Sequence, residues 1–448
     1  MAGGTWLSQN KVRPGAYINF KAVQKGSMTV GDRGIIAIPL SLHWGDTDGL
    51  IEVLSSEMLD GNSKAKVGFT AFDAESKLLA AALSYCYKAL VYRTDREGVK
   101  AEATIGKLKC EAKYFGTYGN KIIVATTLDD ELWTVITYVD GETMDKQVVS
   151  EIAELADNDF VRFSRDTEAV SDTDFVESAG TPLTGGTDGV SVEVTAYPDM
   201  MEKLEAAKWQ TLVCPSSETS IKANIQKFIK RMRDDEGRYV QAVVADYDGA
   251  DHEGIINSVS GAVIDGLTFT KEEFTAIVAG MTAGANFNES NTAREIIGAT
   301  DIIGRLTDAQ IKEALGRGKF LLSASTDGTI KVEQDINSLH TYTKDKSYSF
   351  SKNRVIRTLD EIGTTTVTTW EKTYMGKVDN NATGRSLFKA DLVAYGNEMQ
   401  RLSGIQEFAG PDDISVEQGK DLDSVLATWA CKPTDAMEKL YMECHIRS

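Results

Sequence analysis

Hydrophobic and polar residues alternate with a period of two near both ends of the sequence, a pattern that predicts strands with one buried face. Near the C-terminal end, the side chains on one face are those of Leu440, Met442, Cys444 and Ile446. Near the N-terminal end, the alternation follows a Pro-Gly turn signal and places on one face Ala16, Ile18 and Phe20. Because a strand needs a hydrogen-bonding partner, each segment pairs within its own chain or adds to a neighbour's sheet. Most sheets are intramolecular, which favours the first arrangement, but the alternation alone leaves both open.

Residues 1–27 are predicted to form an N-terminal arm. The residues that follow, 28–105, indicate a small β-rich domain. Residues 34–45 form a mostly apolar run that is typical of a strand, and residues 74–90 repeat apolar side chains at helical spacing. The His43-Trp44 pair lies at the end of the strand. No carboxylate or Cys lies at metal-ligand spacing from this pair, so we interpret it as part of a packed loop.

Residues 106–189 predict a second domain that is β-rich or α+β and contains an acidic linker. Two stretches rich in β-branched and aromatic residues flank a glycine-containing turn at 116–119. Such a turn holds a phosphate only at the start of a helix, and here a strand follows it, so we interpret the turn as structural. Helical spacing of apolar residues predicts a helix at about 146–155, and the acidic stretch 164–189 predicts a surface loop or linker.

Residues 190–335 alternate strand and helix, which predicts a central α/β domain with a mostly parallel sheet covered on both faces. The predicted elements are a strand at 209–216, a helix after it, a strand at 239–246, and helices at about 271–281 and 308–316. Thr307 and Gln310 form a capping box for the last helix. Asp327-Gly328 indicates a hairpin turn between two short strands.

Residues 336–436 predict a C-terminal α+β domain, and residues 437–448 predict a C-terminal arm strand. A helix at about 352–362 would end at Gly363, and a second helix at about 386–403 is followed by two strands. The first helix carries a basic cluster composed of Lys352, Arg354 and Arg357. In an acidic chain this cluster is either a solvated helix face or a docking surface for an acidic partner.

Charge and composition narrow the classes of function. The 448 residues carry a net charge of −19, from 48 Lys and Arg against 67 Asp and Glu. This charge argues against nucleic-acid binding and against attraction to an anionic membrane surface, because both need a basic face. No apolar run is long enough to span a bilayer, and the first residues lack the apolar core of a signal peptide. We expect the five scattered Cys to be reduced thiols of a protein made in a cytoplasm.

Many enzymes place an active site at the edge of a parallel α/β sheet, but the candidates in this sequence are weak. Residues 246–253 gather four carboxylates and His252, yet Ala250 occupies a ligand position of the EF-hand pattern. Residues 316–319 fail the P-loop pattern, Ser216 and Ser217 lack a nucleophile elbow, and the four His support no Ser-His or Cys-His pair. We therefore expect no catalytic, cofactor-binding or metal site. The alternative is a cytoplasmic metal-dependent hydrolase with a site near Asp246–Glu253.

Several short motifs make the sequence resemble the contractile phage tail sheath proteins, above all the compact type of prophages and phage-tail-like bacteriocins. In order, they are GGTW with QNKVRPGAYINF, WGDTDG, AKYFGTYGNKI, LTGGTDG, DINSLHTYT with FSKNRVIRTLD, YMGKVDNNATGR, and PTDAMEKLYMECHI. The resemblance extends over nearly the full length and keeps the order of the motifs.

The resemblance implies a structural subunit rather than an enzyme. Such subunits stack as six-fold rings around an inner tube and add their terminal arms as strands to the C-terminal domain sheets of neighbours. They store energy in their packing, hydrolyse no nucleotide, and contract to drive the tube through a target envelope. The implied arms are residues of about 12–23 and 437–448, and the implied tube-facing helix is the one that carries Lys352, Arg354 and Arg357.

The same resemblance implies the partners of the chain: copies of itself, the inner tube protein, and baseplate and tail terminator proteins. It implies assembly in the cytoplasm of a bacterial host and a final place in the virion, without nucleic-acid binding or membrane insertion. Another virion or surface-layer lattice protein could carry similar arms, and such a protein would differ in the symmetry of its assembly.

Overall fold

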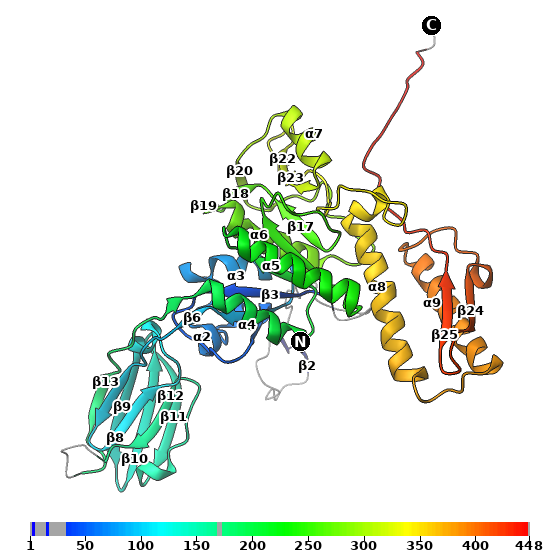
Figure 1. Ribbon diagram of the computed structural model, residues 1–448. Coiled ribbons are helices and arrows are strands. Elements are labelled where there is room, and N and C mark those ends of the chain that lie inside the picture. Colours follow the sequence, from blue (N-terminus) through cyan, green and yellow to red (C-terminus); the bar gives the residue numbers. More distant parts are fainter. Residues whose placement is uncertain (1, 5–14, 18–32, 168–172, 447–448) are drawn as a thin grey trace. The chain divides into compact units, whose positions relative to one another are not determined.

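The computed structural model contains two units, residues 1–32 and residues 33–448 (Figure 1). The structure describes residues 2–4, 15–17, 33–167 and 173–446. No helix among these residues combines the length and the apolar character that a membrane crossing requires.

The first unit holds a short two-stranded pair. Strand β1 (Ala2–Gly4) pairs in parallel with β2 (Gly15–Tyr17), and Ala16 lies opposite Gly3. The strand expected after the Pro-Gly turn signal is therefore present at residues 15–17, with a partner in its own chain. Ile18 and Phe20, the other residues of the expected apolar face, lie outside the described residues.

The second unit is built on a seven-stranded sheet with the order β21-β17-β16-β15-β3-β5-β4. Its strands are β3 (Ile35–Leu40), β4 (Ile51–Leu54), β5 (Lys88–Arg93), β15 (Thr211–Cys214), β16 (Gln241–Ala245), β17 (Ile255–Ser258) and β21 (Lys319–Phe320). All neighbours are parallel except β4 and β5, which confirms the prediction of a mostly parallel sheet. Because β3 pairs with β15, residues 28–105 and 190–335 contribute to one sheet and are not separate domains, contrary to the prediction.

Helices cover both faces of this sheet. They are α3 (Lys77–Leu83), α4 (Glu193–Glu205), α5 (Thr219–Lys230) and α6 (Lys271–Gly284). Ile36 and Ile38 of β3 belong to the core formed with α3 and α6, whereas Ile35 and Ala37 belong to the core formed with α4 and α5. Successive side chains of a strand point to opposite faces, so an uninterrupted apolar run is what a strand covered on both sides requires.

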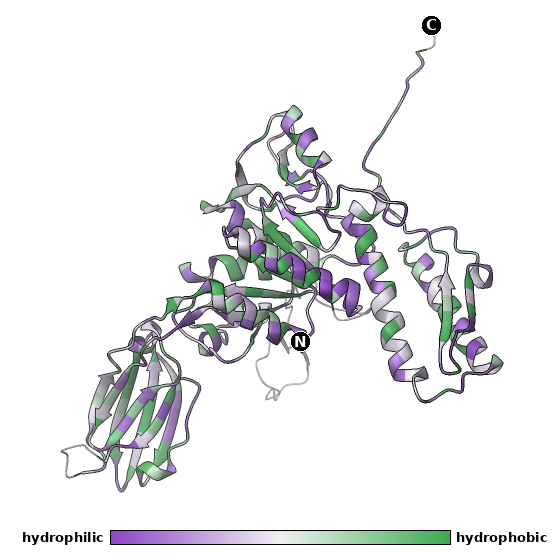
Figure 2. Ribbon diagram, in the orientation of Figure 1, coloured by the Kyte–Doolittle hydropathy of each residue, from purple (hydrophilic) through white to green (hydrophobic). Residues whose placement is uncertain are grey.

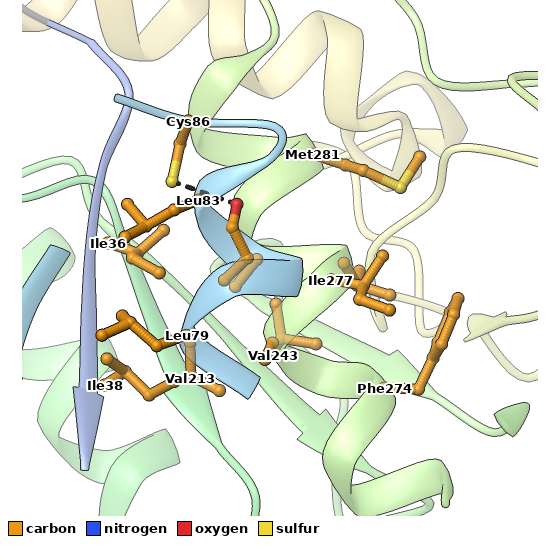
Figure 3. Close-up of a cluster of buried hydrophobic side chains, with 14 of the residues drawn as sticks. Ile36, Ile38, Leu79, Leu83, Cys86, Val213, Val243, Phe274, Ile277 and Met281 are labelled. Atoms are coloured by element: carbon orange, nitrogen blue, oxygen red, sulfur yellow. Dashed lines mark hydrogen bonds between the residues drawn. The ribbon is translucent and has the colours of Figure 1, made fainter. Parts of the chain in front are cut away.

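Figure 3 shows the core under α3 and α6, where side chains from the two helices meet those of the sheet. Leu79 of α3 and Ile277 of α6 lie in the same buried cluster as Val243 of β16. The dashed line marks the hydrogen bond that the thiol of Cys86 donates to the carbonyl of Ala82 at 3.4 Å. Figure 2 shows that the middle strands of the sheet are largely hydrophobic, whereas α5 also carries hydrophilic residues.

The chain between β17 and the C-terminal helices adds small antiparallel sheets and a further helix, α7. The strands are β18 (Gly261–Ile264), β19 (Leu267–Phe269), β20 (Ala299–Ile303), β22 (Leu322–Ala324) and β23 (Ile330–Val332). Strands β22 and β23 form the hairpin predicted at Asp327-Gly328. Helix α7 (Asp308–Gly316) begins with the predicted capping box, in which Thr307 accepts a hydrogen bond from the N–H of Gln310. The helix predicted at 271–281 is α6.

The β-rich domain predicted after residue 106 is a sandwich of two sheets, ordered β11-β10-β9-β13 and β12-β8-β7. Its strands are β7 (Glu102–Ile105), β8 (Leu108–Ala112), β9 (Ile122–Asp129), β10 (Leu132–Val139), β11 (Glu142–Val149), β12 (Val161–Arg165) and β13 (Ser178–Pro182). Leu108, Ile122, Val135 and Val161 are among the side chains of its core.

Two predictions in this domain are wrong. No α-helix forms at 146–155, because β11 continues to Val149 and pairs with β10, and only Ile152–Glu154 form a 3-10 turn. Val148 fits the helical spacing, but it is exposed while Val149 is buried, as the period-two pattern of a strand requires. The stretch 164–189 is not only a linker, since β13 within it pairs with β9.

The C-terminal domain contains two long helices and one hairpin. These are α8 (Asn353–Thr369), which continues in a π-helical turn to Tyr374, α9 (Ala382–Arg401), β24 (Ile414–Gln418) and β25 (Val425–Trp429). Gly363 does not end α8, contrary to the prediction. A Cβ at this position would lie 2.3 Å from the Tyr239 ring, so glycine here allows close packing within a continuing helix.

Candidate assembly site

The C-terminal tail, residues 439–446, forms neither helix nor strand, and every one of its residues is exposed. Leu440 is 85% exposed, Met442 79% and Ile446 93%, and the thiol of Cys444 is free. An alternating segment outside a sheet leaves its backbone N–H and C=O groups without a ladder. The tail therefore has the side-chain pattern of a strand, and no strand of the described residues pairs with it.

The segment before the tail is held to the C-terminal domain by its backbone. The N–H of Gln406 donates to the carbonyl of Lys432 at 2.9 Å, and the N–H of Thr434 donates to the carbonyl of Gly404 at 2.9 Å. Pro433 forms a bridge with Ile405. These contacts fix residues 432–434 beside the loop that follows α9.

Glu438 is the last fixed point before the exposed tail. Its carboxylate accepts hydrogen bonds from the Gln334 amide at 2.6 Å and the Thr292 hydroxyl at 2.8 Å, and it forms an ion pair with Lys352. The side chains of Glu438 and Lys352 are only 11% and 5% exposed. Burial opposes the ionisation of Glu438, but the ammonium and the two hydrogen bonds outweigh it and hold the pKa of Glu438 below its ordinary value. Glu438, called the anchor below, is thus an ionised and mostly buried carboxylate.

The hairpin of β24 and β25 offers free strand edges. Each of the two strands pairs with the other alone among the described strands, so each has one edge without a ladder partner. The hairpin rests on α9 through a core that includes Ile414 and Leu392. A two-stranded sheet is marginal by itself, and an added strand would extend its ladder.

The basic cluster does not form the exposed surface that the sequence suggested. Arg357 has a fully buried side chain that donates to Asp335 at 2.7 Å and to the carbonyl of Glu289 at 2.6 Å. Lys352 is buried against Glu438. Arg354 is the partly exposed member. Two of the three charges are therefore neutralised by carboxylates of their own chain, and contact with a partner stays a prediction for Arg354 alone.

Asp335 is the centre of a buried polar network next to the anchor. Its carboxylate accepts hydrogen bonds from Arg357, from the Asn353 amide at 2.9 Å and from the N–H of Asn291 at 2.9 Å. Burial opposes ionisation, but Arg357 and the hydrogen bonds hold the pKa of Asp335 below its ordinary value. Thr292 joins the network to the anchor, because its hydroxyl accepts the N–H of Asp335 at 2.9 Å and donates to Glu438.

Sequence reasoning missed Asp335 and Glu438 as a connected pair. The signal in the sequence is weak: Asp335 precedes Ile336 in the DINS motif, and Glu438 follows Met437 in PTDAMEKL, which also contains Asp435 and Lys439. A charge among apolar neighbours is rarely buried unless it is paired. The partner, however, is remote in sequence, and no spacing rule identifies it.

The acidic loop proposed as a hydrolase site does not gather its carboxylates. Asp246 binds Lys271 and Lys319, each at 3.0 Å, and Asp248 binds Lys319 at 3.2 Å. Asp251 accepts the backbone N–H groups of residues 340 and 341 instead. These lysines and backbone donors neutralise or cap the carboxylates one by one, which is a structural use of an acidic loop rather than a shared metal site.

A different trio, Asp234, His252 and Glu253, brings its ligand atoms within 4.8 Å of one another. His252 Nε2 lies 3.5 Å from Asp234 and 3.6 Å from Glu253. However, Nδ1 of His252 accepts the N–H of Gly254 at 3.0 Å, so the neutral ring carries its proton on Nε2. In this tautomer Nε2 offers no lone pair to a metal, and it makes no hydrogen bond with the described residues. Burial lowers the pKa of His252, which favours this neutral ring.

Glycine-rich motifs meet where the sandwich joins the large sheet. His43 Nδ1 lies 2.9 Å from the carboxylate of Asp188, which also accepts the N–H of Thr117 at 2.8 Å. Trp44 is fully buried, and a Cβ at Gly116 would lie 1.9 Å from the carbonyl oxygen of His43, so only glycine fits. Trp44 is packed as the loop interpretation predicts, whereas His43 is exposed. Residues 117–121 form a 3-10 helix between Gly116 and β9, so the predicted strand does not follow the glycine turn directly.

Three family models match the chain over most of its length. They are the phage tail sheath protein beta-sandwich domain over residues 96–188, the phage tail sheath protein central domain over residues 191–338, and the phage tail sheath C-terminal domain over residues 345–447. The matches follow the sandwich, the strands β15, β16, β17 and β21 of the large sheet with the additions around them, and the α8–β25 region together with the tail.

Full-length relatives agree with these models. The phage-like element PBSX protein XkdK of Bacillus subtilis (strain 168) is 35% identical over 472 residues, which cover 100% of both chains. A sheath tail protein from Desulfitobacterium hafniense has a crystal structure that is 39% identical with a TM-score of 0.79, over 96% of this chain and 99% of that one. The crystal structure of a sheath tail protein from Listeria innocua is 32% identical with a TM-score of 0.81, over 92% of this chain and 95% of that one.

A more distant structure shows a likeness of fold alone. The cryo-EM structure of the anti-feeding prophage helical sheath in its contracted state has 9% identity and a TM-score of 0.57, over 97% of this chain and 99% of that one.

Proposed function

The chain belongs to the phage tail sheath family, and from this premise we propose that it polymerises as stacked six-fold rings around an inner tube and contracts to drive that tube through a target envelope. Its place as a structural sheath subunit of a phage tail or tail-like particle follows from the family. The ring arrangement and the contraction are the proposed part. A mechanical role needs no catalytic centre, and the energy would be stored in the packing of subunits.

The observation that carries the proposal is the exposed tail. Leu440, Met442, Cys444 and Ile446 alternate along a segment without a ladder, and the hairpin of β24 and β25 has free edges. Strand addition would bury these apolar side chains and satisfy the backbone groups of both segments at once. We propose that the tail of one copy adds to the hairpin sheet of the next, which would link neighbours while their bodies rotate or slide.

We propose the N-terminal segment with Ala16, Ile18 and Phe20 as a second arm, and the partly exposed Arg354 as a contact to the tube protein. Further proposed partners are baseplate and tail terminator proteins, with assembly in the bacterial host cytoplasm. The buried free thiols of Cys86, Cys110 and Cys214 suit a reducing compartment.

The experiment is electron microscopy of the purified full-length protein by negative stain, beside a chain that ends at residue 436. The full-length protein is expected to form long hollow tubes with six-fold symmetry. The shortened chain is expected to stay monomeric with its domains folded, as circular dichroism would check. Polymers that form equally well without residues 437–448 would contradict the proposal.

A further inference from the structure

We infer that Glu438 is a positioning residue that clamps the C-terminal tail to the central sheet of its own subunit, so that the freedom of the tail begins at residue 439. The clamp is a property of the single chain. Its consequence for the polymer rests on the proposed function.

The clamp ties the tail to a different part of the unit from the one that the tail leaves. Residues 432–434 are bound to the loop after α9, in the C-terminal domain. Glu438 instead binds Thr292 and Gln334, which lie between α6 and α8, and Lys352, which is the N-cap residue of α8. The segment between these two points therefore bridges the hairpin domain and the region built on the large sheet.

A continuous series of hydrogen bonds leads from the clamp to a central strand. Thr292 connects Glu438 to Asp335, and Asp335 accepts a hydrogen bond from Asn353. Asn353 in turn accepts one from the side chain of Gln241, the first residue of β16, at 3.3 Å. Asp335, Asn353 and Gln241 are all buried. A pull on the tail would thus act on the central sheet through a buried network rather than on a loose loop.

The position of the clamp sets how far the tail reaches. At about 3.3 Å per residue, residues 439–446 extend over about 26 Å, and release of residues 435–438 would add about 13 Å. A fixed starting point also reduces the number of conformations that the tail loses when it docks, which strengthens binding without a new contact. The clamp would therefore select the neighbour and register that the tail meets.

The test compares Glu438→Ala with Glu407→Ala in the full-length chain. Glu407 pairs with Lys432 in the same segment at 2.6 Å, but both side chains are exposed, so its loss should leave the tail in place. Trypsin cleaves after Lys439, and a protease needs several mobile residues on each side of the bond. Under native conditions we expect cleavage about tenfold faster in Glu438→Ala and unchanged in Glu407→Ala, because local release exposes the site.

Two results would overturn the clamp: equal cleavage rates in all three proteins, or a rate increase that merely follows a loss of global stability in denaturant unfolding. The reciprocal double variant Glu438→Lys with Lys352→Glu supplies a further readout, since a reversed pair should return the rate of cleavage after Lys439 toward that of the original chain. Mass spectrometry of the products counts this cleavage apart from cleavage after the lysine introduced at position 438. A double variant that is no slower than Glu438→Ala would contradict an ion-pair clamp.

The concentration at which the variants assemble into tubes is the second measurement of the test. If the tubes form, Glu438→Ala is expected to raise the concentration needed for assembly about tenfold, and Glu407→Ala to leave it unchanged. An unchanged assembly concentration in Glu438→Ala would overturn the link between clamp and assembly. A failure of the original chain to form tubes would contradict the proposed function, whereas the cleavage rates of the single chain would still decide the clamp.

Discussion

The large sheet and the C-terminal tail show opposite relations between sequence pattern and bonding. In the sheet, strands such as β3 and β16 find ladders on both sides and apolar cover on both faces within one chain. In the tail, residues with an equally clear strand pattern have neither ladder nor cover. The difference teaches that an apolar alternation predicts a strand but does not show which strand will pair with it.

Charged side chains at the edge of the large sheet bind partners within the chain. The carboxylates after β16 bind lysines or accept backbone N–H groups, and Nδ1 of His252 accepts the N–H of Gly254. These side chains hold the loops at the edge of the sheet in place.

The largest effect is expected in the core of the large sheet. Phe274 of α6 is fully buried, and Phe274→Ala should lower the free energy of unfolding by about 3–5 kcal/mol because it leaves a cavity. Denaturant unfolding at a protein concentration below that of assembly measures this loss in the free energy of unfolding. A loss under about 1 kcal/mol would mean that this face of the sheet is not the closed core described above.

Removal of one partner from the buried polar network should come next. Arg357→Met leaves the Asp335 carboxylate without its countercharge, and a loss of about 3 kcal/mol is expected for an isolated buried charge. The control is Arg401→Met, whose ion pair with Glu398 is exposed and whose loss should change little. Equal effects of the two substitutions would refute the distinction between interior and surface charges.

A smaller loss is expected at the glycine inside α8. Gly363→Ala improves helix propensity but places a methyl group about 2.3 Å from the Tyr239 ring, so a net loss of about 1–3 kcal/mol is expected from overpacking. The double variant with Tyr239→Ala should recover part of this loss. A stabilising Gly363→Ala would show that the ring moves aside and that close packing is not why glycine stands there.

The pH dependence of the free energy of unfolding tests the burial of His252. The pKa of His252 is lowered by burial, so the unfolded chain binds a proton more readily, and its contribution to stability is present above about pH 6.5 and lost as the pH falls. The slope is at most about 1.4 kcal/mol per pH unit. His252→Gln should flatten the curve of unfolding free energy against pH between pH 7 and 5, as denaturant unfolding at a series of pH values would measure.

The smallest effect on folding is expected in the tail itself. Leu440→Ser with Met442→Ser should change the free energy of unfolding of the single chain by less than about 0.5 kcal/mol, because both side chains are already exposed. The same variant should assemble poorly, as sedimentation of polymers would show. Normal assembly of the double variant would separate the tail from polymer formation.

The sequence predicted what depends on local pattern and missed what depends on distant contacts. The hairpin at Asp327-Gly328, the capping box at Thr307 and the mostly parallel sheet follow from turn chemistry, caps and apolar runs. The prediction of a helix at 146–155 was wrong because Val148 fits the helical spacing, whereas the pairing of β11 with β10 buries Val149 and exposes Val148.

At the candidate site, too, the sequence predicted the local pattern and missed the contacts between distant segments. The alternation of the tail is visible in the sequence, whereas the burial of Arg357 by Asp335 is not, since the two residues come from segments that meet only in the fold. Lys352 and Arg357 looked like a surface because a basic cluster on a helix usually is one. The anchor at Glu438 depends on three partners that no single spacing connects.

The most direct measurement is lysine cross-linking in tubes assembled from an equal mixture of unlabelled and isotope-labelled protein, read by mass spectrometry. Lys439 begins the tail, and Lys420 lies in the turn between β24 and β25. If the tail of one copy adds to the hairpin of another, peptides that join Lys439 to Lys420 will combine labelled with unlabelled chains in the statistical proportion. Cross-links found only within chains of one label would contradict strand addition between subunits.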